Sequence, residues 1–265
     1  MRINNNITAL NSHRQYTINN SGIGKNVEKL SSGFRVNRAG DDAAGLAISE
    51  KMRTQIRGLN MASKNSQDGI SLVQTAEGAM QTAHNIMQRM RELAVQSRNG
   101  TNDQSVDRNA LNLEFDQLRA EITQIESTVK FNDMTVFSAS FTLQTGANSA
   151  DFTTFSISSI ANIGAAVNIS SETLAAQAIG EMTTAINTLS TSRATLGAIQ
   201  NRLEFKIQNL DNSAENLTAA ESRIRDVDMA KMMTEFTKNN ILFQASTAML
   251  AQANAIPQGV LQLLG

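Results

Sequence analysis

An apolar residue occupies every seventh position of the sequence between residues 182 and 224. This spacing is the heptad repeat of helices that pack along one seam. The positions three residues after each of them are mixed, because they include Lys206 and two serines beside apolar residues. At a rise of about 1.5 Å per residue the repeat predicts one helix of roughly 60 Å, far longer than the helices of a compact domain. We therefore expect a helical rod whose heptad seam consists of Met182, Leu189, Leu196, Leu203, Leu210, Leu217 and Ile224.

The composition supports helix-on-helix packing and excludes several classes of site. Only 4% of the chain is aromatic, and it contains no Trp and no Cys. A narrow aliphatic core of this kind suits packing along a seam. The lack of cysteine excludes disulfides, thiol nucleophiles and thiolate metal sites. A net charge of −1 gives no reason to expect nucleic acid or an anionic membrane as a partner.

The apolar runs are too short for a membrane span. No stretch approaches eighteen consecutive apolar residues. Residues 1–6 include an arginine and three asparagines, so they are too polar for a cleaved secretory signal. We expect a soluble chain with no membrane span.

Two further segments carry strong helical periodicity. In residues 43–98 the apolar positions step by three and four, and the same holds for residues 104–129. Asp41 or Asp42 is placed to cap the first of these helices. Short connections imply that helices 43–98, 104–129 and 174–227 pack antiparallel as a bundle or coiled coil. The first stripe consists of Val73, Ala76, Met80, Ala83, Met87, Met90 and Ala94, and it is widened by Leu72, Ala79, Ile86 and Leu93.

Both ends of the chain are weaker. Residues 1–32 have a sparse apolar stripe that ends before Gly33, and such a helix needs an external partner to form. At the other end, no charged residue follows Lys238. An uncharged but partly polar tail neither spans a bilayer nor stays soluble when exposed. Burial against identical neighbours would resolve both difficulties.

Residues 131–160 change character. Phe141 and Leu143 alternate with polar residues, and residues 146–149 form a turn signal before Phe155 and Ile157. We expect a β-hairpin near residues 141–158, followed by a loop at residues 161–173.

The sequence shows no catalytic centre. His13 and His84 lie in separate segments without metal-ligand spacing. The Gly22–Lys25 stretch resembles a phosphate loop only superficially, because Asn19 replaces its first glycine and Asn26 its Mg²⁺-binding hydroxyl. No nucleophile, base and orienting group converge, so we expect no enzyme, no cofactor and no metal.

Several motifs together resemble bacterial flagellin. They are LSSGFRVN at residues 30–37, DDAAGLAI at 41–48, DGIS at 68–71, QTAEGA at 74–79, RELAVQ at 91–96, LGAIQNR at 196–202, SRIRDVD at 222–228 and LAQAN at 250–254. The resemblance covers both ends and most of the chain between them. It implies a structural subunit that polymerises into the flagellar filament for swimming. A related hook-filament junction protein is the alternative.

The resemblance also implies a domain organisation. Residues 1–32 with 228–265 would form the inner core of the filament, and residues 33–227 would form a helical rod domain carrying the hairpin. Larger flagellins insert outer domains between their two halves, whereas here only the loop at residues 161–173 could hold one. We therefore expect no outer variable domain.

The remaining expectations come from the resemblance too. It implies self-association, contacts with an export chaperone, the filament cap and hook-junction proteins, and export through the flagellar secretion channel to an extracellular filament. It also implies that a host innate immune receptor contacts Gln88, Arg89, Leu93, Gln96 and Glu121. The periodicity places Arg89 and Gln96 outside the core row, and Leu93 at its edge as an exposed apolar residue.

Overall fold

The computed structural model describes residues 6–103, 106–161 and 167–264. Two short antiparallel hairpins accompany long helices in the described parts of the chain, so the predicted mainly helical fold class is confirmed. In chain order the elements are α1 (Ile7–Ser32), α2 (Ala43–Ser97), α3 (Asp107–Thr128), β1 (Lys130–Phe131), β2 (Met134–Thr135), β3 (Ala139–Gln144), β4 (Phe152–Ile157), α4 (Glu172–Arg225) and α5 (Met229–Leu264).

The chain forms two compact units. The terminal unit contains Met1–Thr54 and Asn216–Gly265, and the central unit contains Gln55–Glu215. Helices α2 and α4 each contribute to both units. The predicted assignment of residues 33–227 to a single filament domain stays a prediction.

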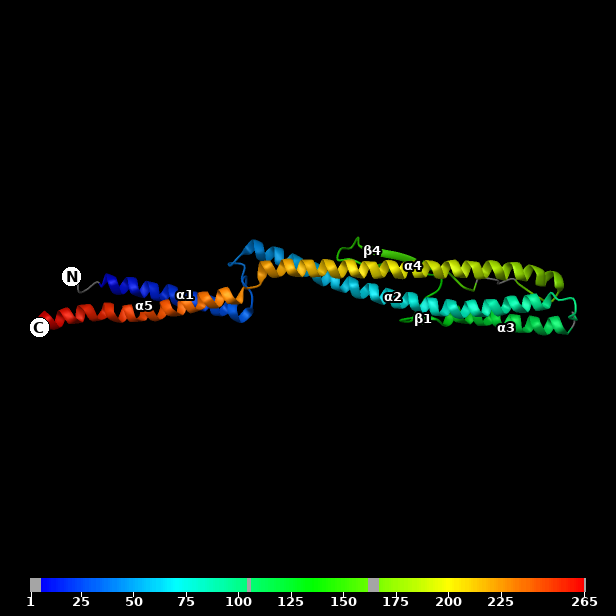
Figure 1. Cartoon of the computed structure of the whole chain (residues 1–265), viewed down its shortest axis with the longest axis horizontal. Coiled ribbons are helices and arrows are strands. Elements are labelled where there is room, and N and C mark those ends of the chain that lie inside the picture. Colours follow the sequence, from blue (N-terminus) through cyan, green and yellow to red (C-terminus); the bar gives the residue numbers. More distant parts are fainter. Residues whose placement is uncertain (1–5, 104–105, 162–166, 265) are drawn as a thin grey trace. The chain divides into compact units, whose positions relative to one another are not determined.

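In the central unit, α2 lies between α3 and α4 (Figure 1). The α2 residues of the apolar core all come from the predicted stripe, and Phe115 of α3 and Met182 of α4 belong to the same core. Arg91 Nε donates to Thr183 Oγ1 over 3.2 Å, and Arg193 pairs with Glu77 at 3.5 Å. These two contacts run in opposite directions along α2 and α4, so the helices are antiparallel as predicted.

The predicted hairpin is formed by β3 and β4, which pair from Ala139 opposite Ile157 to Gln144 opposite Phe152. Alternate residues of β4 are buried, as expected for a strand with one face on a core. A Cβ on Gly69 of α2 would overlap the side chain of Leu143. A glycine in this helix therefore lets the hairpin approach α2 closely.

A second, smaller hairpin was not predicted. Strands β1 and β2 have two residues each and are joined by Asn132 and Asp133, whose φ angles are 50° and 62°. Two adjacent residues with positive φ are typical of a tight hairpin turn, and Asn and Asp tolerate that conformation. The Asn-Asp pair was the signal in the sequence for this turn.

In the terminal unit, α1 and α5 run side by side (Figure 1). Helix α1 is continuous from Ile7 to Ser32, and it ends where predicted, because Gly33 has φ 75° and donates its backbone N–H to Lys29. The partner that the sequence required for residues 1–32 is α5.

The connections of the terminal unit are also ordered by hydrogen bonds. Asp42 caps α2 by accepting the N–H of Gly45 over 2.8 Å. Asp41 instead accepts the backbone N–H groups of Arg38 and Asn37, which lower the pKa of its carboxyl. The capping role that the sequence suggested therefore belongs to Asp42, whereas Asp41 orders the loop before α2.

Candidate functional site

The heptad seam lies on α4 and faces the other helices of its own chain. Its first five residues, from Met182 to Leu210, each expose at most 4% of their surface. Leu217 and Ile224 are half-buried. Met182, Leu189 and Leu196 belong to the core that α2 and α3 complete. In the row of mixed residues three positions after the seam, polar Lys206 is exposed and apolar Ala185 is buried.

The candidate receptor residues of α2 divide into two groups. Gln88, Arg89 and Gln96 are exposed, whereas Leu93 has no exposed surface. The prediction that Leu93 is an exposed apolar spot is wrong. Leu93 lies at the edge of the heptad row, and it is buried because α2 packs against both α3 and α4. The buried surface of α2 is therefore wider than one seam.

Arg89 connects α2 to α3 through a carboxylate that the sequence interpretation missed. Its Nε and Nη2 donate to Glu114 Oε1 over 3.0 and 2.9 Å, and its Nη1 donates to Glu92 Oε2 over 3.3 Å. The hydrogen bonds to Glu114 and then to Glu92 raise the pKa of Arg89. Glu121, the predicted α3 member of this surface, is exposed but lies seven residues farther along, about 10 Å away along the helix axis. The apolar periodicity of α2 and α3 does not specify how the two helices are aligned along each other. The sequence therefore did not indicate that Glu114 lies beside Arg89.

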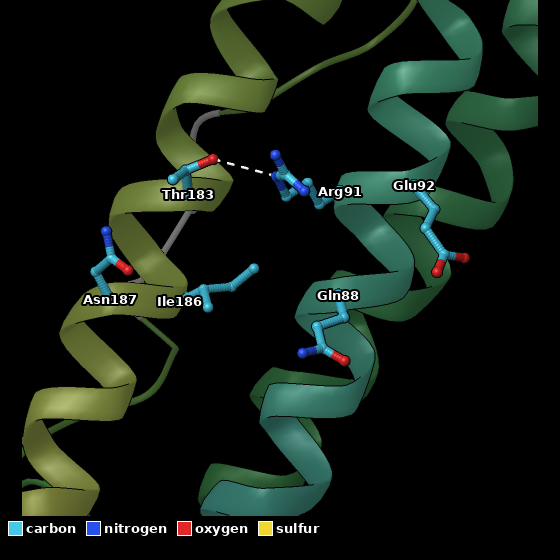
Figure 2. A pocket seen from close by; sticks show the side chains of 6 residues that line it. All are labelled: Gln88, Arg91, Glu92, Thr183, Ile186 and Asn187. Atoms are coloured by element: carbon cyan, nitrogen blue, oxygen red, sulfur yellow. Dashed lines mark hydrogen bonds between the residues drawn. The ribbon is translucent and has the colours of Figure 1, made fainter.

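A groove lies beside these residues between α2 and α4 (Figure 2). It has a volume of about 360 Å³ and is lined by Gln88, Arg91, Glu92, Thr183, Ile186 and Asn187. Arg91 and Thr183 point toward each other across it and are hydrogen-bonded, while Ile186 points toward α2. The groove is therefore an open, largely polar space between two helices. It lacks the apolar, enclosed walls of a small-molecule site.

The histidines do not gather into a metal centre. His13 lies beside Tyr16 with ring centroids 6.3 Å apart, and His84 shares a 3.0 Å hydrogen bond with Gln88. No group of three His, Cys, Asp or Glu side chains suited to a metal occurs in the described parts of the chain. Among the described helices, none is both long and apolar enough to cross a membrane.

Many large apolar side chains are exposed on the terminal unit. Among the side chains that the structure describes in α1 and α5, ten large apolar ones each expose between 41 and 66% of their surface. These side chains are distributed around the two helices, and we call the set the exposed apolar face: Ile7, Leu10, Ile18, Val27, Met229, Met233, Ile241, Leu242, Met249 and Ile256. Helix α5 also has no charged residue after Lys238. Exposed apolar surface on this scale is typical of a site that binds other proteins.

Comparison with known proteins identifies the family. Residues 3–142 match the bacterial flagellin N-terminal helical region, and residues 179–264 match the bacterial flagellin C-terminal helical region. The chain is 58% identical to the flagellin of Halalkalibacterium halodurans and 51% identical to the flagellin of Bacillus subtilis, in each case over the full length of both proteins. It is 46% identical, again over both full lengths, to the flagellar filament 33 kDa core protein of Treponema phagedenis.

A solved structure agrees with these matches. The crystal structure of Bacillus cereus flagellin superposes with a TM-score of 0.52 at 31% identity, covering 60% of this chain and 94% of that one. The long packed helices, the buried heptad seam and the exposed apolar ends thus occur in a chain whose full-length relatives are flagellins. This chain belongs to the bacterial flagellin family and is a structural, non-enzymatic subunit of the flagellar filament.

Proposed function

We propose that the exposed apolar face of α1 and α5 binds the same face of neighbouring copies and so builds the inner core of the filament. Residues 1–32 and 228–265 would form this core, residues 33–227 would surround it, and no outer variable domain would follow. The single observation that carries the proposal is the set of ten large apolar side chains left uncovered on these two helices.

The magnitude of the burial supports an assembly role. Covering the exposed half of an Ile, Leu or Met side chain contributes about 1 kcal/mol. Ten such residues would contribute about 10 kcal/mol per copy before the entropic costs of association. The tail after Lys238 adds no charge that would have to be desolvated.

Aspartate substitutions on this face test the proposal. Ile18 and Ile241 are 56 and 61% exposed, so I18D and I241D should leave the helical content and melting of the purified subunit unchanged. Each variant should abolish filament growth from seeds, because a charge would be buried between copies. Electron microscopy of the seeded samples measures this growth. F205D is the matched control, since Phe205 is 70% exposed on α4 and outside this face. Normal filaments from both I18D and I241D would refute the proposal.

The same face provides a reason for partners before and after assembly. An apolar surface of this extent has to be covered while the subunit is unassembled, which suits an export chaperone. At the two ends of a filament it would contact hook-junction proteins and the filament cap. Export through the flagellar secretion channel, without a cleaved signal, to the extracellular filament belongs to the same proposal and rests on the family.

A host innate immune receptor is the last proposed partner. Gln88, Arg89, Gln96 and Glu121 would meet it through exposed polar groups, and the buried Leu93 would hold α2 in place beneath them. The same surface would contact neighbouring subunits, so only the free subunit would be recognised. R89D removes the hydrogen bonds to Glu114 and reverses the charge, and it should weaken both receptor activation and filament growth. Arg57, an exposed arginine of the same helix, provides the control R57D. Wild-type receptor activation by R89D would count against a role for this surface.

A further inference from the structure

The half-buried large side chains of α1 and α5 recur every seven residues, at Tyr16, Ile23 and Leu30 of α1 and at Phe236, Phe243 and Leu250 of α5. Other large apolar side chains of the two helices belong to the exposed apolar face. The buried residues are Asn26 of α1 with Met232 and Ala253 of α5, among the side chains that the structure describes in these helices. In most helix pairs the burial of apolar side chains decides how one helix slides along the other. Here the apolar rows repeat every seven residues, so they would meet again after a slip of one heptad, and something else has to set the register.

Side-chain amides make the specific contacts between the two helices. Asn6 Nδ2 donates to the backbone oxygen of Ala253 over 2.8 Å. Asn19 Nδ2 donates to Ser246 Oγ over 2.9 Å. Beside them, the rings of Tyr16 and Phe243 pack with centroids 4.9 Å apart. A slip of one heptad would move α5 by about 10 Å and would separate Asn19 from Ser246 and Asn6 from the carbonyl of Ala253.

Asn26 adds an independent argument. It is 8% exposed, and its Nδ2 has no hydrogen-bond partner in the structure. A buried amide without a partner lowers the stability of a helix pair, and an apolar residue would pack there more favourably. A polar residue at a buried position of a coiled coil is known to select one register at the expense of stability.

We propose that Asn6, Asn19 and Asn26 fix the register in which α1 pairs with α5. The register determines which residues of the two helices lie together on the exposed apolar face. The three asparagines are therefore specificity-determining residues for the surface that the subunit offers to its neighbours. The register itself does not depend on how that surface is used, although its importance for assembly rests on the function proposed above.

Cysteine cross-linking measures the register directly, because the natural chain contains no cysteine. A Cβ on Gly22 would lie 3.2 Å from Asn239 Nδ2, so the pair G22C and N239C reports the observed register. The pair G22C and M232C reports a slip of one heptad. Both cysteine pairs are introduced into three forms of the full chain. The first keeps the natural asparagines, the second combines N6A, N19L and N26L, and the third carries N20L as a control, because Asn20 is exposed. Intramolecular disulfides are quantified under dilute oxidising conditions, in the free subunit and in any filaments that form.

With the natural asparagines and with N20L, we expect the 22–239 disulfide to exceed the 22–232 disulfide at least tenfold. In the triple variant the 22–232 disulfide should rise at least fivefold, and N26L alone should raise the melting temperature of the helix pair. Equal yields of the two disulfides in the natural background, or an unchanged ratio in the triple variant, would overturn the proposal. Because the readout is intramolecular, it is separate from the filament-growth test of the proposed function.

Discussion

Leu203 offers a quantitative test of the heptad seam. Its side chain is 1% exposed on α4 within the central unit. L203A removes about three buried carbon atoms, which at about 0.8 kcal/mol each amounts to roughly 2.4 kcal/mol of lost transfer free energy. The cavity left behind adds to this, so the free energy of unfolding should fall by about 3 kcal/mol. For a unit of this size that corresponds to a fall in melting temperature of about 10 °C.

The assay is thermal and urea unfolding of the subunit, followed by circular dichroism at 222 nm. L217A is a graded comparison, because Leu217 is only half-buried and should lose about half as much. F205A is the matched control two residues from Leu203, and at 70% exposure it should change stability by less than about 0.5 kcal/mol. L203D, which buries a charge, should unfold or shorten the central helices. The seam assignment is refuted if L203A melts like the natural protein or if F205A is as destabilising as L203A.

Three further predictions concern the terminal unit. Hydrogen bonds from Arg225 and then from Arg53 lower the pKa of the Glu50 carboxyl below its ordinary value of 4.5. The stabilisation from these bonds is therefore complete above pH 4.5 and is lost as the pH falls through the lowered pKa of the folded chain. Acid unfolding should show this loss of stability, and E50Q should remove this pH dependence. G33A should destabilise the end of α1 by about 1 kcal/mol, because residue 33 has φ 75°, which an alanine rarely adopts. An unchanged melting temperature in G33A would argue against this helix cap. Limited proteolysis of the free subunit should trim residues 1–32 and 228–265 before the central unit, because few of their side chains are buried; uniform resistance would contradict this.

The long helices were predictable from the sequence because their periods persist over many turns. Each added heptad repeats the same evidence, so the stripe of α2 and the seam of α4 gave close bounds for both helices. The hairpin of β3 and β4 followed from alternation and a turn signal. The predicted function, a flagellar filament subunit, is confirmed by full-length relatives and not by periodicity. Those relatives are named as flagellins or filament core proteins, which favours the filament subunit over the junction-protein alternative.

The contacts between elements were not predictable in the same way. Leu93 was misplaced because one stripe does not reveal that α2 packs against two helices. Glu114 was missed because its distance from Arg89 depends on how the loop after α2 sets the register of α3. The asparagines of α1 likewise gave no signal, because a polar residue in a sparse stripe predicts exposure, whereas Asn26 is buried. These features depend on tertiary packing, which local sequence patterns do not specify.

A helical reconstruction of filaments assembled from this chain tests the central claim most directly. We expect α1 and α5 of neighbouring copies to lie together in the inner layer, with Ile7, Ile18, Ile241 and Met249 buried between copies. The central unit should lie outside this layer, with Leu203 still buried within its own chain. A filament in which α1 and α5 leave those four side chains exposed to solvent, while the central units make the contacts, would contradict the account.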